Sequence, residues 1–231
     1  FYDDIMTIAK SLPKLRQTLL FSATMPLKIR DLANKLLKKP ENINIAISKP
    51  ADGITQVAYM CYDHQKVKLV RVILSNIGKK LSHVLIFASS IKSVREITRT
   101  LNKAGMRASE MHSGLDQKQR EKTIREFKNK KIRILVATDI LSRGIDIKGI
   151  ELVINYEVPY DAEDYVHRIG RTARADKTGE AITFINAKQV NDFINIEKLI
   201  EKQVPKLKLP KSFDPGPEYK MLPKKKKWKK K

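Results

Sequence analysis

The chain has 231 residues, of which 42% are hydrophobic and 31% are charged. This composition is ample for one ordinary α/β domain with appendages and excludes a disordered polymer. No run approaches the ~20 apolar residues of a membrane span, and the acidic start at residues 1–4 lacks the pattern of a secretion signal. We therefore expect a soluble, cytoplasmic protein without a membrane partner.

The net charge is the strongest compositional signal. The 47 Lys and Arg residues against 25 Asp and Glu give +22, which exceeds what solubility requires and predicts a polyanionic partner. Because the chain opens on Phe1 instead of Met, we expect a fragment of a longer protein. The one cysteine, Cys61, excludes an internal disulfide and a zinc–cysteine cluster, so we expect a core thiol there and assign no metal ligands.

The first 47 residues have the pattern of the end of an α/β domain. Two helices, over residues 3–12 and 27–37, and two strands, over residues 17–21 and 43–47, are predicted there. Residues 48–55 have the composition of a linker. We therefore expect residues 1–47 to be the C-terminal remnant of a first domain.

A fresh alternation of strands and helices begins after the linker. Strands are predicted over residues 56–62, 84–88, 107–111, 132–137, 152–156 and 180–185, and helices over residues 64–77, 91–104, 116–129, 161–169 and 187–202. Near-continuous apolar strands between helices predict a parallel sheet covered on both faces, so we expect a doubly wound α/β domain over residues 56–205. Residues 206–231, rich in Lys and Pro, are expected to be a disordered basic tail.

Small polar clusters follow several of the predicted strands. They are Ala88–Ser90, His112–Gly114, Thr138–Asp139 and Ser142–Asp146. Because the carboxyl ends of parallel strands share one edge of the sheet, we expect these clusters to converge there. Short hydroxyl side chains and glycines expose backbone N–H groups, which suit phosphate oxygens. Each cluster taken singly is better explained as capping or turn residues, but four clusters on one edge of a basic domain weaken that explanation.

The segment HRIGRTAR, which begins at His167, is the sharpest local feature. If the helix persists, His167, Arg171 and Arg174 lie within about 60° of one another and form a cationic stripe. We expect Asp164 to pair with Arg168 four residues later, which leaves the other two arginines without a counter-charge in their own helix. A transferring phosphoryl group needs such guanidinium groups, whereas spacing alone favours a solvated basic face.

Six motifs occur in order over residues 15–185. They are FSATMP at 21–26, VLIFASS at 84–90, the turn at 112–114, Gln117 with Arg120, VATDILSRGID at 136–146 and YVHRIGRTAR at 165–174. Together they resemble the DEAD-box ATP-dependent RNA helicases, in the bacterial RhlE-like form. The resemblance implies two RecA-like domains, with the end of the helicase ATP-binding domain at residues 1–47 and the helicase C-terminal RecA-like domain at residues 56–205.

The same resemblance implies roles in ATP hydrolysis. Arg171 and Arg174 match the two arginine fingers that reach the γ-phosphate of ATP held by the other domain, and Asp146 matches a position near the ATP ribose. The coupling of ATP turnover to strand separation is implied for three further residues, namely Ser22, Thr24 and His167.

An RNA partner also enters through the resemblance. The residues that match those holding the RNA sugar-phosphate backbone are Ser89, Gly114, Arg120, Thr138 and Gly144. Contacts of this type do not read bases, so we expect binding that is largely independent of sequence and sensitive to salt. Ribonucleoprotein complexes are compatible substrates.

Two parts of an ATPase are absent from the sequence. The chain holds no G-x-x-x-x-G-K-[ST] phosphate loop and no acidic magnesium motif, so ATP and Mg²⁺ would be held mainly by the other domain. We therefore expect this fragment alone to be inactive as an ATP hydrolase. Ala173 stands where the family usually has glycine, which affects the local geometry more than the chemistry.

Alternative functions stay open at this point. A non-catalytic basic RNA-binding module explains the charge without ATP, and a DNA-directed superfamily 2 helicase shares part of the motif pattern. The Lys-rich tail is either a solvated appendage or an extra RNA tether, and Trp228 among its lysines favours the tether because an indole ring offers a base-stacking surface.

Overall fold

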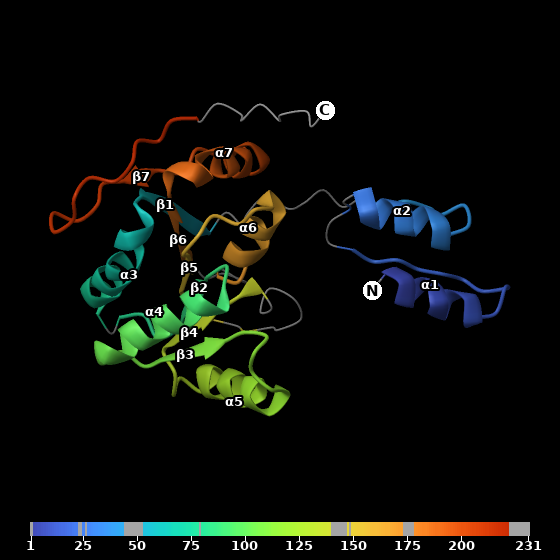
Figure 1. Cartoon of the computed structure of the whole chain (residues 1–231), viewed down its shortest axis with the longest axis horizontal. Coiled ribbons are helices and arrows are strands. Elements are labelled where there is room, and N and C mark those ends of the chain that lie inside the picture. Colours follow the sequence, from blue (N-terminus) through green and yellow to red (C-terminus); the bar gives the residue numbers. More distant parts are fainter. Residues whose placement is uncertain are drawn as a thin grey trace, which may run out of the picture. The chain divides into compact units, whose positions relative to one another are not determined.

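The structure is a computed structural model that describes residues 2–22, 25, 27–43, 53–78, 80–139, 147, 149–172 and 178–221. The chain divides into two compact units, Phe1–Ser48 and Lys49–Lys231 (Figure 1). The division falls at the predicted linker, while the assignment of the first unit to an ATP-binding domain stays a prediction. No helix in the described segments has the length and apolar character that a membrane crossing requires.

The first unit contains two helices, α1 (Tyr2–Ser11) and α2 (Leu27–Leu36), which confirms both predicted helices. The predicted strand over residues 17–21 is wrong. That segment is irregular, and Leu19 and Phe21 are 66% and 89% exposed. No strand in the described part of this unit pairs with it, and an unpaired strand leaves its backbone donors and acceptors without partners. The predicted strand over residues 43–47 lies mostly outside the described residues.

The second unit is built on a parallel sheet of seven strands. They are β1 (Ile54–Met60), β2 (Val84–Phe87), β3 (Ala108–Met111), β4 (Ile134–Ala137), β5 (Leu152–Asn155), β6 (Gly179–Ile185) and β7 (Lys206–Leu207). Their order across the sheet is β3-β4-β2-β5-β6-β1-β7, with every pairing parallel. The predicted α/β class, with its parallel sheet, is confirmed.

Helices cover both faces of this sheet (Figure 1). They are α3 (Asp63–Ile77) and α4 (Ile91–Lys103) on one face, and α5 (Gln117–Lys128), α6 (Ala162–Ile169) and α7 (Val190–Leu199) on the other. Along one strand, alternate side chains pack against the helices on opposite faces of the sheet. In β2, Val84 and Ile86 pack toward α3 and α4, while Leu85 and Phe87 pack toward α5. Burial on both faces explains why these strands are continuous apolar runs.

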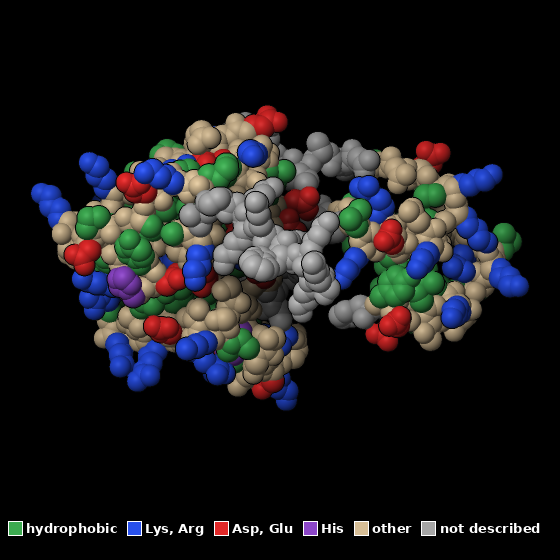
Figure 2. All heavy atoms as spheres, turned by 45° about the horizontal axis from the view of Figure 1, so that its top comes forward, with side chains coloured by type: hydrophobic (Ala, Val, Ile, Leu, Met, Phe, Trp, Pro, Cys, Tyr) green, Lys and Arg blue, Asp and Glu red, His purple; other side chains and the backbone are tan. Residues whose placement is uncertain are grey.

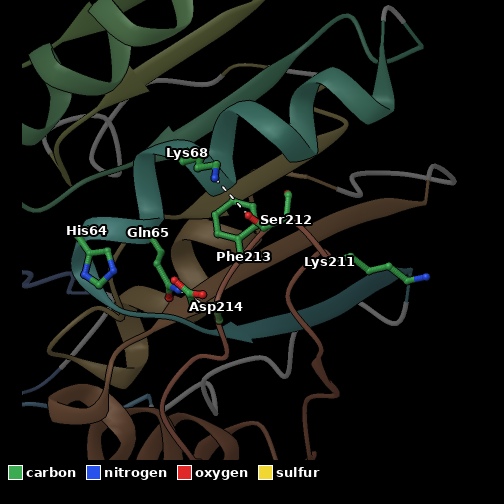
Figure 3. A pocket seen from close by; sticks show the side chains of 7 residues that line it. All are labelled: His64, Gln65, Lys68, Lys211, Ser212, Phe213 and Asp214. Carbon is green, nitrogen blue, oxygen red and sulfur yellow. Dashed lines mark hydrogen bonds between the residues drawn. The ribbon is translucent and has the colours of Figure 1, made fainter.

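Residues 206–221 differ from the expected disordered tail. Strand β7 pairs with β1 at Ala58 and Tyr59, and residues 212–214 then contact the start of α3 through Gln65 and Lys68. Phe213 packs against the core beside α3, with the Lys68 ammonium 4.8 Å from its ring centre (Figure 3). Lys68 also donates to the Ser212 carbonyl at 3.2 Å, and the Lys211 side chain points away. Sequence composition missed this segment because its few apolar residues find their partners only in the folded domain.

The same segment is anchored a second time on α7. The buried Glu197 carboxylate accepts hydrogen bonds from the Val204 amide at 2.7 Å and from the Tyr219 hydroxyl at 2.6 Å, and it pairs with the Lys206 ammonium. Tyr219 also packs edge-on against Phe193 of α7. One buried acid therefore ties three points of residues 204–219 to a single helix.

We expect Gly216→Ala to loosen this segment. A Cβ atom at Gly216 would overlap the backbone oxygen of Met60, so the chain has to shift. Overpacking of this kind lowers the free energy of unfolding by about 1–3 kcal/mol. Urea unfolding of the whole chain, with amide hydrogen exchange at Leu207, measures the effect. Lys211→Ala is the control and should change neither quantity, and unchanged exchange in Gly216→Ala would contradict the prediction.

Candidate functional site

At the carboxyl edge of the sheet, the connections that leave two neighbouring strands diverge. Strand β2 leads to α4 on one face, while its neighbour β5 leads to α6 on the opposite face. Ligands of open α/β sheets bind where neighbouring connections diverge in this way. The polar residues Ser89, Asp139 and Glu157 follow β2, β4 and β5 at this point.

Three of the predicted RNA contacts meet at this edge. Ser89, Gly114 and Thr138 follow β2, β3 and β4, which are adjacent in the sheet. Arg120, in the first turn of α5, donates from Nη2 to the Ser113 carbonyl at 3.0 Å and so lies beside the Gly114 turn. Gly144, the fifth predicted contact, lies outside the described residues.

The backbone N–H groups of these residues already have acceptors within the protein. Thr138 donates to the Met111 carbonyl at 3.1 Å, Gly114 to His112 Nδ1 at 3.1 Å, and Ser89 to Glu157 Oε2 at 3.0 Å. The expectation that these clusters expose their N–H groups is therefore wrong for these three amides. The reason is that the turn after each strand folds back on its neighbours and satisfies its own donors.

His112 fixes the shape of the Gly114 turn. Because the Gly114 amide donates to Nδ1, the proton of the neutral ring is on Nε2, which lies 3.5 Å from Glu110 Oε1. The ring is fully buried. A Cβ at position 114 would lie 3.2 Å from Nδ1, so glycine lets the backbone approach the ring closely.

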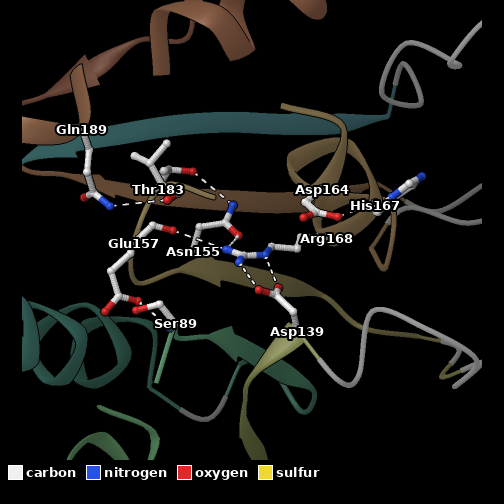
Figure 4. Close-up of polar contacts among 10 residues, drawn as sticks. Ser89, Asp139, Asn155, Glu157, Asp164, His167, Arg168, Thr183 and Gln189 are labelled. Carbon is white, nitrogen blue, oxygen red and sulfur yellow. Dashed lines mark hydrogen bonds and ion pairs between the residues drawn. The ribbon is translucent and has the colours of Figure 1, made fainter. Parts of the chain in front are cut away.

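Arg168 of α6 joins the ends of three strands (Figure 4). Its guanidinium donates to both carboxylate oxygens of Asp139, at 2.7 and 2.8 Å. A third nitrogen donates to Asn155 Oδ1 and to the Glu157 carbonyl, each at 3.4 Å, and the group lies 5.2 Å from the Phe87 ring centre. Arg168 is 3% exposed, so it belongs to the core more than to the surface.

The expected pairing of Arg168 with Asp164 is therefore wrong. Asp164 instead lies 4.0 Å from His167 Nδ1 on the same helix. Arg168 turns inward because Asp139, at the end of β4, offers two oxygens in the planar arrangement that suits a guanidinium fork. Spacing along the helix predicts only partners within the same helix, so it could not predict Asp139, which follows a strand.

The expected cationic stripe does not form as one helix face. Helix α6 ends at Ile169, and the Arg171 amide donates to the Arg168 carbonyl in the turn that follows. Thr172 then pairs with Ile150, its hydroxyl donating to the Ile150 carbonyl at 2.6 Å. Arg171 is thus fixed by backbone contacts on both sides. Arg174 lies outside the described residues.

The remaining predicted site residues are divided between the units. Ser22 lies in an irregular segment of the first unit, before α2, and His167 lies in the last turn of α6. Thr24 and Asp146 lie outside the described residues.

Sequence analysis missed two residues of this edge, Glu157 and Lys66. Glu157 follows β5 in the same way that Ser89 follows β2, so the polar residue directly after an apolar run was an available signal. Lys66 is 1% exposed, and its ammonium lies 2.8 Å from Asp63 and 3.5 Å from Gln189 Oε1. No local pattern distinguishes this buried lysine from a surface one in α3.

The described residues do not form a metal site. No group of three or more His, Cys, Asp or Glu side chains among them is arranged to hold an ion. Asp139, the carboxylate that follows β4, is already engaged by Arg168. A cage of protein ligands for a metal ion is therefore not found among the described residues.

Two acids bond to backbone amides at opposite ends of the β2–β5 pair, and their pKa values shift in opposite directions. For Glu157, burial raises the pKa more than the Ser89 amide and the Lys66 charge lower it. For Glu151, burial also raises the pKa, but the hydrogen bonds from His83 and Ser82 outweigh it and the net pKa is lowered.

We expect opposite pH effects from replacing these acids. A lowered pKa means that Glu151 contributes stability above its ordinary value of 4.5, which is lost as the pH falls, so Glu151→Gln should lower the free energy of unfolding near neutral pH and have little effect in acid. A raised pKa gives the reverse dependence, so Glu157→Gln should raise that free energy near neutral pH. Urea unfolding across a pH series measures both, and parallel curves would contradict the assignment.

We expect Arg168→Ala to lower the free energy of unfolding by about 3 kcal/mol. This value is the lower end of the range for breaking a buried ion pair, because the Asp139 side chain is 47% exposed and is hydrated once Arg168 is removed. Lys220→Ala is the matched control, since it removes an ion pair with Glu218 that is exposed on both sides. Chemical unfolding of both variants checks this. Equal effects would show that burial of the guanidinium is unimportant.

Comparison with known proteins identifies the domain. Residues 65–176 match the model of the helicase conserved C-terminal domain. The ATP-dependent RNA helicase CshA of Listeria monocytogenes is 40% identical over 91% of this chain and 40% of its own length. The DEAD-box ATP-dependent RNA helicase RhpA of Helicobacter pylori (strain 26695) is 37% identical over 91% of this chain and 42% of its own length. The chain thus spans less than half the length of these relatives.

Solved structures agree with this assignment. A DEAD box protein from the hyperthermophile Methanococcus jannaschii is 37% identical, with a TM-score of 0.63 over 89% of this chain and 55% of its own. Dbp5 of Saccharomyces cerevisiae, bound to RNA and ADP BeF3, is 26% identical, with a TM-score of 0.78 over 89% of this chain and 55% of its own. The finer likeness to RhlE stays a prediction. By these matches the chain belongs to the DEAD-box helicases, and its second unit is a RecA-like helicase C-terminal domain.

Proposed function

We propose that this chain is part of an ATP-dependent RNA helicase. Its second unit would hold the RNA sugar-phosphate backbone and supply arginine fingers to ATP hydrolysis that drives local duplex unwinding. The observation that carries the proposal is the placement of Ser89, Gly114 and Thr138 at the ends of three adjacent strands, in a domain that belongs to the helicase family.

The charge of the chain supports an RNA partner. Lys and Arg side chains are spread over the visible face of the second unit, with fewer acids among them (Figure 2). Arg120 holds the Gly114 turn, so a guanidinium lies next to one predicted backbone contact. Phosphates and sugars are alike at every nucleotide, so binding through such groups is independent of sequence and weakens steeply with salt. The relative Dbp5 was solved with RNA, which agrees with this partner.

The turn after α6 supports the role of Arg171. It is held from one side by the Arg168 carbonyl and from the other by the Thr172–Ile150 pairing. A fixed backbone reduces the conformational freedom that a finger must lose when it meets a phosphoryl group. Arg174 would act beside it, and Asp146 would contact the ribose of ATP.

The other parts of the machinery would come from the first domain and from the interface. ATP and Mg²⁺ would be held mainly by the other RecA-like domain. Ser22, Thr24 and His167 would couple ATP turnover to strand separation when the domains close around both ligands. The Lys-rich end of the chain would tether RNA and raise its local concentration.

The alternatives are less well supported. A non-catalytic RNA-binding module and a DNA-directed helicase both fit the charge, but the relatives over 91% of this chain are ATP-dependent RNA helicases. The fragment itself is expected to be inactive without its partner domain.

The finger assignment is tested in the longer protein to which this chain belongs. We expect the double variant Arg171→Ala with Arg174→Ala to lose RNA-stimulated phosphate release by at least about a thousandfold, while RNA affinity is retained. Arg71→Ala, an exposed arginine of α3, is the control and should keep full activity. Undiminished turnover in the double variant would refute the finger role, and equal stimulation by single-stranded DNA would refute the RNA preference.

A further inference from the structure

The Ser89 amide differs from the other two bonded amides at the carboxyl edge. Thr138 donates to a backbone carbonyl and Gly114 to a neutral imidazole nitrogen, whereas Ser89 donates to the carboxylate of Glu157 at 3.0 Å. A carboxylate oxygen carries negative charge, as a phosphate oxygen does, and binds N–H groups with similar geometry. The amide of a predicted RNA contact is therefore occupied by an anion from the protein itself.

Glu157 lies in a position that disfavours its charge. The residue is only partly exposed, and its side chain extends from the end of β5 toward Ser89, which follows β2 (Figure 4). Burial raises the pKa of this carboxyl, while the Ser89 amide and the positive charges of Lys66 from α3 and Arg168 from α6 lower it without cancelling the rise. The carboxylate is therefore held here at a cost.

A structural tie between the same two strands already exists at the opposite edge. Glu151, just before β5, accepts hydrogen bonds from the amides of Ser82 and His83, just before β2, and its pKa is lowered. That acid is stabilised by its contacts, as a structural tie should be. Glu157 accepts one hydrogen bond from a backbone amide, and its pKa is raised. A structural role in joining the two strands therefore explains Glu157 less well than it explains Glu151.

We propose that Glu157 is an internal competitor of RNA, whose carboxylate occupies the Ser89 amide in the RNA-free protein and is displaced by a phosphate oxygen of the bound strand. The proposal rests on the proposed RNA-binding function of this edge. The exchange breaks the hydrogen bond from the Ser89 amide to the Glu157 carboxylate and forms one from the same amide to a phosphate oxygen. It also releases the carboxylate from a position in which burial disfavours its charge. Glu157 thereby lowers RNA affinity and favours release of the strand.

Binding of a short single-stranded uridine oligonucleotide by the whole chain, measured by fluorescence anisotropy, tests this competition. We expect Glu157→Gln and Glu157→Ala to bind about fivefold to tenfold more tightly than the unchanged chain, because a neutral or absent acceptor competes less strongly for the amide than a carboxylate does. A second readout is the Ser89 amide resonance, which should shift on RNA addition in the unchanged chain.

Two control variants separate competition from simpler effects. Glu96→Gln removes one negative charge from the exposed face of α4, and Glu151→Gln removes the corresponding tie at the opposite edge. Both should leave RNA affinity within about twofold of the original, since neither touches the Ser89 amide. If either control variant gained as much RNA affinity as the Glu157 variants, the proposal would be overturned. The gain would then be explained by weaker charge repulsion of RNA in general or by a change in stability.

The outcomes also separate this proposal from the function on which it rests. RNA binding by the unchanged chain with no gain in the Glu157 variants overturns the competitor role and leaves RNA binding intact. Absence of RNA binding by every variant overturns both. A tighter complex in the Glu157 variants alone, with a shifted Ser89 amide, supports the competitor.

Discussion

Parallel pairing of every strand is the constraint on which the second unit depends. It places the carboxyl ends of β2, β3, β4 and β5 at one edge, so residues far apart in sequence meet there. Each connection must then cross a face of the sheet, which buries the strands on both sides and requires helices of matching apolar faces. The candidate site is a consequence of this arrangement, since the polar residues that follow different strands come together at one edge of the sheet.

The charged groups of this edge form a connected set in which the protein satisfies most of its own donors. Arg168 bonds to Asp139, to Asn155 and to the carbonyl of Glu157, whose carboxylate in turn receives the Ser89 amide. A ligand of the Ser89, Gly114 and Thr138 amides would therefore have to replace acceptors that the protein itself supplies.

Much of the second unit could be predicted from sequence, because continuous apolar strands and helical periodicity are local signals. The fold class, most of its strands and its helices follow from them. Residues 206–221 did not, since Phe213 and Tyr219 are isolated apolar side chains whose partners, α3 and α7, lie far away in the chain. The irregular segment at 17–21 shows the converse, because an apolar run forms a strand only where another strand pairs with it.

Sequence by itself determined the family of the domain and the types of residue at the site, through motifs whose order and spacing are specific. The tertiary structure alone decided which groups are bonded. It paired Arg168 with Asp139 in place of Asp164, ended α6 before Arg171, and set Glu157 against the Ser89 amide. The physical reason is that hydrogen bonds between ends of different strands depend on strand order and register, which spacing along one chain does not contain.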